Sequence, residues 1–217
     1  VMLKAYKYRI YPNQSQQEQL AKAFGCVRFV YNLGLETKVA AWTSAQKRYS
    51  CIDLSNQMVE LKNVEAPWLK ECPSQALQMS LRNLDNAYTN FFNRGFGFPK
   101  FKNKHEKQSM QFPQGIRLEE DGTIFIPKLK SVAIDLHRPI GKGEMKTATL
   151  SRTVTGKYFI SLLVENGKEM PAKRPIDAST AVGVDFGITH LAITSDGKKF
   201  ENKEFLLSSM RALRVAQ

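Results

Sequence analysis

Residues 4–20, KAYKYRIYPNQSQQEQL, change their hydrophobic period halfway and thereby decide how the chain is organised. Residues 4–11 alternate with a period of two, as expected of a half-buried strand, and the buried side would carry Tyr6, Tyr8 and Ile10. Pro12 ends the strand. The next residues, 15–18, have the pattern of a capping box at a helix start. A strand that leads directly into a long helix is therefore predicted.

Three helices are expected in the following stretch, each with an apolar stripe at helical spacing. The first stripe consists of Leu20, Phe24, Val27 and Tyr31. The second consists of Leu54, Met58 and Leu61. The third helix opens at Pro73 and its stripe consists of Leu77, Leu81, Leu84, Tyr88 and Phe91. We interpret these aromatic residues as core rather than as a base-stacking platform, and we expect the helices to pack together.

From about residue 116 the period changes to two. Residues 116–126 predict a hairpin that turns at Asp121–Gly122, residues 132–136 a short strand, and residues 145–165 a hairpin that closes at Thr155–Gly156. The opening strand has no partner in the helical stretch, so we expect it to join this antiparallel part. The helices then form an insertion, and residues 166–177, with two prolines and mixed charge, are predicted to be a linker.

The charge of the chain favours a polyanionic partner. Its 217 residues include 32 Lys and Arg against 20 Asp and Glu, which gives a net charge of +12. Cations alternate with Phe96, Phe98 and Phe101 in residues 93–112, a pattern suited to phosphate contact and base stacking. The candidate nucleic-acid-binding residues are Lys7, Arg9, Arg94, Lys100, Lys102, Lys104 and Lys107. The alternative is a solvated basic loop held by a few phenylalanines.

Several other classes of protein have little support in the sequence. Cys26, Cys51 and Cys72 are odd in number and form no C-x-x-C pair, so neither a disulfide framework nor a zinc ribbon is expected, and a reducing cytoplasm fits best. No apolar run is long enough to cross a bilayer, and the first residues do not resemble a signal peptide. The histidines His105, His137 and His190 match no metal spacing or triad, and no Ser or Cys nucleophile motif is present.

One carboxylate stands out in residues 181–197, AVGVDFGITHLAITSDG. Asp185 lies between Gly183 and Gly187 on an apolar segment that we expect to be a strand buried in a sheet, followed by a second strand and a turn at Asp196–Gly197. A buried carboxylate is costly unless it is paired or holds a metal. The glycines would let a ligand or another backbone approach closely. The alternative is an aspartate that caps a turn at a strand end.

Three stretches together resemble the N-terminal half of the TnpB family, also called OrfB, of transposon-encoded RNA-guided DNA nucleases related to the type V CRISPR effectors. They are residues 4–20, residues 97–110 (GFPKFKNKHEKQSM) and residues 182–197 (VGVDFGITHLAITSDG). The resemblance implies an α+β multidomain fold. It consists of a small antiparallel β-barrel (wedge) with an inserted helical bundle, followed by the start of an RNase H-like (RuvC) α/β domain.

The domain boundaries that follow from this resemblance are residues 1–12 for the first wedge strand and 13–112 for a helical recognition lobe with the basic aromatic loop at 93–112. Residues 113–176 would complete the wedge, and 178–217 would begin the RuvC domain. The family implies a guide RNA and a double-stranded DNA target as partners. It also implies Asp185 as a ligand of catalytic Mg²⁺.

The family's second-motif Glu, four-cysteine zinc ribbon and third-motif Asp have no match in this sequence. One carboxylate cannot assemble a two-metal site, so we expect the chain as given to lack a complete nuclease site and to be inactive. It would then be either a fragment of a nuclease or a shortened product that binds nucleic acid without cutting, as a regulator or transposition accessory. A remote alternative is an actin- or sugar-kinase-like ATP-binding protein, because residues 185–189 also fit the D-x-G-x-T phosphate loop of that superfamily.

Overall fold

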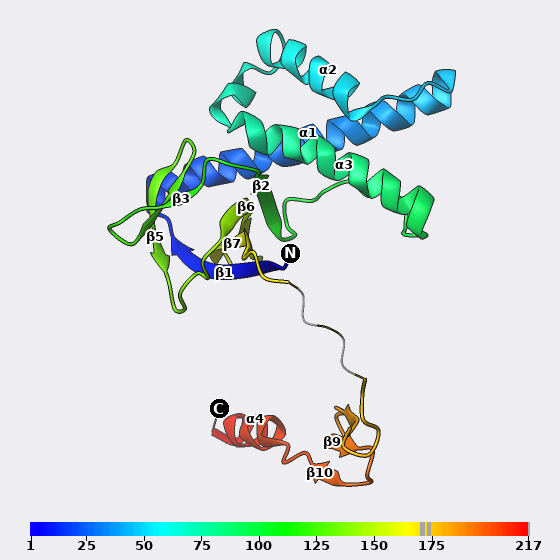
Figure 1. Cartoon of the computed structure of the whole chain (residues 1–217), viewed down its shortest axis with the longest axis vertical. Coiled ribbons are helices and arrows are strands. Elements are labelled where there is room, and N and C mark those ends of the chain that lie inside the picture. Colours follow the sequence, from blue (N-terminus) through cyan, green and yellow to red (C-terminus); the bar gives the residue numbers. More distant parts are fainter. Residues whose placement is uncertain (170–171, 173–174, 217) are drawn as a thin grey trace. The chain divides into compact units, whose positions relative to one another are not determined.

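The computed structural model describes residues 1–169, 172 and 175–216. The chain divides into two compact units, Val1–Met170 and Pro171–Gln217, and each is described by itself (Figure 1). Residues 170, 171, 173 and 174 of the predicted linker lie outside the described residues.

The first unit is α+β. It begins with β1 (Leu3–Tyr11), followed by the helices α1 (Gln14–Ala45), α2 (Cys51–Asn63), the 3-10 helix η1 (Pro67–Glu71) and α3 (Ser74–Arg94). Six strands follow: β2 (Gln108–Phe112), β3 (Arg117–Leu118), β4 (Thr123–Ile126), β5 (Lys130–Asp135), β6 (Glu144–Arg152) and β7 (Tyr158–Glu165). The three predicted helices and both predicted hairpins are thereby confirmed.

The opening strand joins the sheet, as its lack of a partner among the helices predicted, and it is the middle strand of the sheet. The strand order is β2-β6-β7-β1-β5-β4-β3, and β1 pairs with both neighbours in antiparallel fashion. Its register with β7 runs from Leu3 opposite Glu165 to Ile10 opposite Tyr158. The helices are thus inserted between a strand and the sheet that this strand completes.

The expected closed barrel is not found in the part of the chain that the structure describes. The two edge strands, β2 and β3, pair with one neighbour each and not with one another. β3 has only two residues, and β2 packs against α3 and α1. The sheet is therefore large, antiparallel and open.

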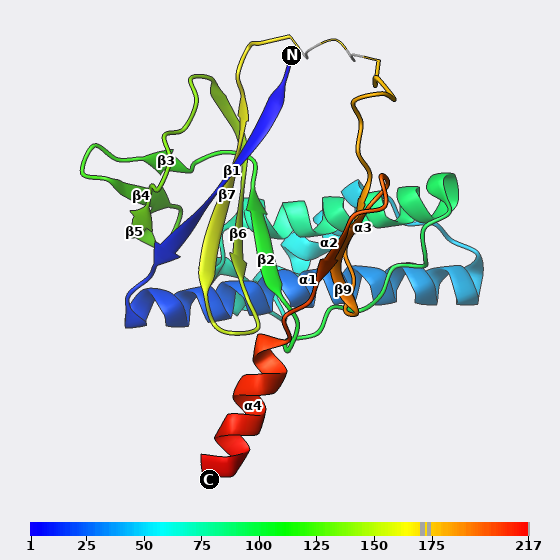
Figure 2. The same cartoon turned by 90° about the horizontal axis from the view of Figure 1, so that it is seen from below.

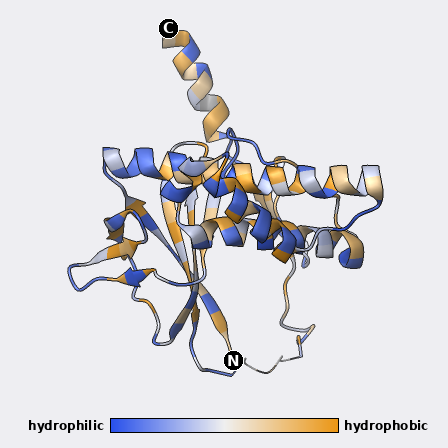
Figure 3. Cartoon of the chain, turned by 90° about the horizontal axis from the view of Figure 1, so that it is seen from above, coloured by the Kyte–Doolittle hydropathy of each residue, from blue (hydrophilic) through white to orange (hydrophobic). Residues whose placement is uncertain are grey.

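The helices pack on one face of this sheet (Figure 2). Every second residue of the strands points toward the helices and packs against the predicted apolar stripes, so that strands and helices share one core. Its largest fully buried members include Tyr8, Leu20, Leu77, Leu84, Phe112 and Leu150. Tyr88 and Phe91, which we expected in this core, are only half-buried. Colouring by hydropathy shows the polar start of α1 and the mixed apolar and polar strands of the sheet (Figure 3).

The start of α1 corrects the predicted capping box. The N-cap is Asn13, two residues before the expected Ser15. Its side chain accepts a hydrogen bond from the Gln16 amide at 2.9 Å, and the Asn13 amide donates to the Gln16 side chain at 3.0 Å. The Gln16 side chain also donates to the carbonyl oxygens of Leu129 and Ser131, which ties the helix start to the sheet.

The second unit contains β8 (Val184–Asp185), β9 (His190–Thr194), β10 (Lys199–Glu201) and α4 (Phe205–Ala216). The strands form a sheet in the order β10-β9-β8. The predicted strand pair and the turn at Asp196–Gly197 are confirmed, with Gly197 at a φ of 86°. The expectation of a buried strand at 181–186 is wrong, because these residues are exposed. Within the described residues, no helix is long and apolar enough to cross a membrane.

Candidate nucleic-acid interface and the Asp185 strand

The basic aromatic loop follows α3 and precedes β2. α3 ends at Arg94 and is capped by Gly95, whose φ of 69° is readily adopted by glycine and whose amide donates a hydrogen bond to the Asn90 carbonyl. At the other end of the loop, the Gln108 side chain donates to the carbonyl oxygens of Asn103 and Glu106, each at 2.8 Å. The helix end and the strand start therefore hold the loop at both ends.

The middle of the loop is attached to α1 through Asn32. The Asn32 side chain accepts a hydrogen bond from the Lys102 amide at 2.8 Å and donates one to the Lys102 carbonyl at 3.1 Å. The Lys102 ammonium lies 4.2 Å from the centroid of the Tyr31 ring, at the distance of a cation–π contact. Burial lowers the pKa of Lys102. The structure thus places this candidate against the helix, in the position of an anchor for the loop.

The remaining loop cations point to solvent. Arg94, Lys100, Lys104 and Lys107 are exposed, and in the described part of the chain none of them forms an ion pair. Phe96 and Phe101 are exposed beside them, at 62% and 59% of their surface. Unpaired cations next to exposed aromatic rings can contact phosphates and stack on bases without first breaking internal interactions.

Lys7 and Arg9 lie on a different element. They occupy the positions of β1 that alternate with the buried Tyr8, so their side chains leave the sheet on its other face. The cationic groups lie 4.6 Å and 5.3 Å from the Phe159 ring centroid. The Arg9 Nε atom is buried without a hydrogen-bond partner in the described residues. Both cations therefore contact the same aromatic ring on the sheet. They lie on β1, whereas the other candidates belong to the loop between α3 and β2.

Asp185 is an exposed residue at the end of the two-residue strand β8. It lies opposite Ile193 in the antiparallel pair with β9, and the backbone of Gly183 is fixed by two hydrogen bonds to Ser195. A Cβ at Gly187 would come within 3.2 Å of the His190 carbonyl oxygen, so the turn is close-packed there.

The donor set around Asp185 does not by itself fit a magnesium centre. Mg²⁺ requires several oxygen ligands in octahedral geometry. Over the residues described, no group of three or more His, Cys, Asp and Glu side chains gathers at one place. Asp196 is engaged in its own turn, since it accepts a hydrogen bond from the Thr194 hydroxyl and pairs with Lys198 at 3.0 Å. The Thr194 hydrogen bond holds the pKa of Asp196 below its ordinary value.

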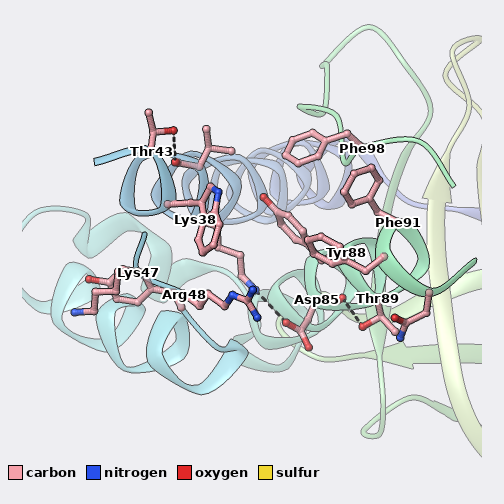
Figure 4. Close-up of a pocket in the computed structure, with 14 residues that line it drawn as sticks. Lys38, Thr43, Lys47, Arg48, Asp85, Tyr88, Thr89, Phe91 and Phe98 are labelled. Carbon is pink, nitrogen blue, oxygen red and sulfur yellow. Dashed lines mark hydrogen bonds and ion pairs between the residues drawn. The ribbon is translucent and has the colours of Figure 1, made fainter. Parts of the chain in front are cut away.

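Sequence reasoning missed a pocket of about 610 Å³ between the C-terminal halves of α1 and α3 (Figure 4). Aromatic and cationic side chains line it, among them Lys38, Trp42, Lys47, Arg48, Tyr88 and Phe98. The signal was present in the cations of residues 38–48, which accompany Trp42. It was missed because the aromatic residues of α3 were assigned to the core.

The N-terminal part of the chain is similar to a known domain family. A helix-turn-helix domain family, HTH_OrfB_IS605, matches residues 2–47. In the structure this range, all of it described, contains β1 and one uninterrupted helix. The matched region therefore folds here as a strand and a helix, without a turn between two helices.

Two relatives that match nearly the whole chain are more than 30% identical to it. The chain is 37% identical over 219 aligned residues to a Streptomyces pristinaespiralis protein named "Putative RNA-guided DNA endonuclease", covering 99% of this chain and 53% of that protein. It is 34% identical over 201 residues to InsQ of Escherichia coli, which has the same descriptive name, covering 92% of this chain and 49% of InsQ. The chain thus spans about half the length of these relatives.

A shorter relative is the virulence protein VsdF of Salmonella dublin. It is 39% identical over 116 residues, which cover 49% of this chain and 98% of VsdF.

The helix-turn-helix match and the two long alignments agree with the resemblance carried by residues 4–20, 97–110 and 182–197. On these comparisons, the chain belongs to the TnpB/OrfB family.

Proposed function

We propose that this chain is the nucleic-acid-binding part of a transposon-associated, RNA-guided DNA endonuclease, and that it binds a guide RNA and a double-stranded DNA target. The observation that carries the proposal is the anchored loop with four exposed, unpaired cations, in a chain with a net charge of +12. The names of the two long relatives support the choice of RNA and DNA as partners.

In this proposal the parts of the chain have separate tasks. Residues 1–12 and 113–176 form the wedge, residues 13–112 the recognition lobe, and residues 178–217 the start of the RuvC domain. The wedge and the recognition lobe would hold the RNA scaffold and read a short DNA motif, while base pairing with the guide selects the target. Lys7 and Arg9 serve the wedge, and Arg94, Lys100, Lys104 and Lys107 serve the lobe. Lys102 holds the loop against α1.

Asp185 is proposed as one ligand of a divalent cation, Mg²⁺ in this family. Such a cation would activate water and stabilise the leaving oxygen in phosphodiester cleavage. Asp185 would contribute one carboxylate, and the exposed strand end leaves that carboxylate accessible. The zinc ribbon of the family has no proposed counterpart among Cys26, Cys51 and Cys72, since Cys26 and Cys72 are buried in the helical core.

The second candidate function is a nucleic-acid binder that does not cut, such as a regulator or transposition accessory. Asp185 is exposed at a strand end, and in the described part of the chain it belongs to no cluster of carboxylates, which favours this candidate. Both candidates require the same basic loop, so they differ only in cleavage.

A charge-reversal experiment tests the binding proposal. The variant carrying Lys100→Glu, Lys104→Glu and Lys107→Glu should lose about tenfold or more in affinity for RNA and DNA of any sequence, measured by fluorescence anisotropy. The slope of log affinity against log salt on duplex DNA should fall by about 3, because each lysine releases about one counterion.

The matched control makes the same change in net charge elsewhere. Lys70, Lys128 and Lys157 are exposed and form no ion pair in the described residues, and they lie outside the loop. Replacing these three with Glu should alter affinity much less. Equal losses in the two triple variants would show that net charge alone, and not the loop, attracts the nucleic acid.

A further inference from the structure

The pocket between α1 and α3 has a wall of packed aromatic rings. Phe98 meets Tyr88 and Phe91 edge to face, with ring centroids 5.6 Å and 5.4 Å apart, and Phe92 stacks on Tyr88 at 6.2 Å. Figure 4 shows Tyr88, Phe91 and Phe98 close together on one side of the pocket. Because each ring is held by the others, the wall can receive a flat ligand with little loss of side-chain freedom.

Much of this aromatic surface is open to solvent. Phe92 is 73% exposed, Phe98 48% and Trp42 44%. Large exposed apolar side chains that gather in one hollow mark a binding site, whereas scattered ones do not. The volume of about 610 Å³ is within the range of about 300–1,000 Å³ that small-molecule sites occupy.

The polar side chains of the pocket are mainly cationic. Lys38 is bound to Asp85 at 3.0 Å and lies 5.0 Å from the Tyr88 ring centroid. Arg48 lies 5.2 Å from the Trp42 ring centroid, and Lys47 lies 4.8 Å from the Tyr49 ring centroid. Neither Lys47 nor Arg48 has an ion-pair partner among the described residues. Three cations against one carboxylate leave an excess positive charge beside the aromatic wall.

We infer that this pocket binds one unpaired nucleotide of a single-stranded nucleic acid. The base would stack on the rings, the phosphate would meet Lys47 and Arg48, and Asp85 would accept a hydrogen bond from an amino group of the base. The excess of positive charge favours this occupant over an apolar protein segment, which needs no cations. The inference rests on the proposed nucleic-acid binding but concerns a site distinct from the exposed loop lysines.

The two tryptophans of the chain allow the pocket to be observed directly. Trp42 lines the pocket, whereas Trp68 lies on η1, where its ring contacts Phe29. A Trp68→Phe variant therefore keeps Trp42 as its single tryptophan. Titration with short single-stranded oligoribonucleotides and oligodeoxyribonucleotides should quench its fluorescence to saturation. The reciprocal Trp42→Phe variant should show much less quenching, and the comparison of the two oligonucleotides assigns the sugar preference.

Affinity gives an independent measurement. Phe92→Ala removes a side chain that is 73% exposed, so the fold should survive, and single-strand affinity should fall about fivefold or more. Phe200→Ala is the matched control, since Phe200 is 50% exposed on β10 and lies neither in the basic loop nor in the lining of the pocket. The affinity of this variant should change less than about twofold, because no base is expected to stack on the removed ring.

Three results would overturn the inference. Absent Trp42 quenching while anisotropy still reports oligonucleotide binding would reject the pocket and leave the proposed function intact. No binding of any RNA or DNA would reject both. Quenching by a peptide with the sequence of residues 205–216, an amphipathic helix of this chain, without quenching by oligonucleotides, would assign the pocket to a protein segment instead.

Discussion

At the scale of single residues, the cations of the loop differ in what they do. Lys102 belongs to the same alternating pattern as Lys100 and Lys104, yet its ammonium lies on the Tyr31 ring and its backbone is bound at both polar atoms by Asn32. Burial disfavours the charged ammonium and lowers its pKa. The contact with the Tyr31 ring offsets part of the free-energy cost of burying this charge. Lys102 therefore fixes the loop to α1, while Lys100 and Lys104 on either side of it stay exposed to solvent.

Asn32→Ala tests this role without changing any charge. The variant loses both hydrogen bonds to residue 102 and should be less stable by about 1–3 kcal/mol in urea unfolding, because each bond contributes about 0.5–1.5 kcal/mol. Its affinity for nucleic acid should also fall, since the loop cations are less fixed. Asn86→Ala is the control, because Asn86 is exposed on α3 and its side chain makes no hydrogen bond in the described residues. Unchanged affinity in the Asn32 variant would show that the loop binds without this anchor.

The same residues show how far the site could be predicted. The alternating cations and phenylalanines of 93–112 follow from local sequence, and most of the cations are indeed exposed. That Lys102 turns inward depends on Asn32, 70 positions earlier, so no local pattern could reveal it. Asp185 was expected in a buried strand because its neighbours are apolar, whereas burial depends on what packs on the strand, which hydropathy alone does not contain.

At the scale of elements, the packing of α1 against α3 depends on one of the two glycines in α1. Gly25 and Gly34 occur in the same 32-residue helix. A Cβ at Gly25 would meet no atom within 4 Å, whereas one at Gly34 would come within 3.0 Å of Leu84 and 3.1 Å of Leu81. Both leucines are buried, so neither can move aside easily. Gly34 is therefore needed for the close approach of α1 and α3.

The two glycines form a matched pair of variants. Gly25→Ala should stabilise the chain by about 0.5–1 kcal/mol, because alanine is the better helix former. Gly34→Ala should destabilise it by about 1–3 kcal/mol through overpacking. Urea unfolding followed by circular dichroism measures both. A gain of stability in the Gly34 variant would mean that the leucines repack without cost.

Elements defined by local signals were predictable, and those defined by distant contacts were not. The turns at Asp121–Gly122 and Thr155–Gly156 follow from dipeptides that favour hairpins. The period of two identified β1 as a strand, and the lack of a partner in the helical stretch assigned it to the sheet. Closure of a barrel depends instead on whether β2 and β3, at opposite edges, reach each other. The helix start moved from Ser15 to Asn13 because Gln16 both completes the cap and bonds to the sheet.

At the scale of the whole molecule, the sheet and helices form one compact unit and the Asp185 strand belongs to another. The first unit carries the proposed loop and pocket, both built from residues with defined contacts. The second carries a single proposed metal ligand on an exposed strand end. Binding and cleavage are therefore expected to be separable properties of this chain.

Cleavage assays with the purified chain test that separation. A two-metal centre requires several carboxylates in fixed geometry, and Asp185 supplies one. The chain should bind labelled DNA and RNA but give no Mg²⁺-dependent cleavage, so the labelled substrate should stay intact both with Mg²⁺ and with EDTA. Asp185→Asn should then behave like the unmodified chain. If cleavage does occur with Mg²⁺ and is abolished by Asp185→Asn but not by Asp196→Asn, Asp185 lies in a complete metal site formed by this chain, and the proposed separation is wrong.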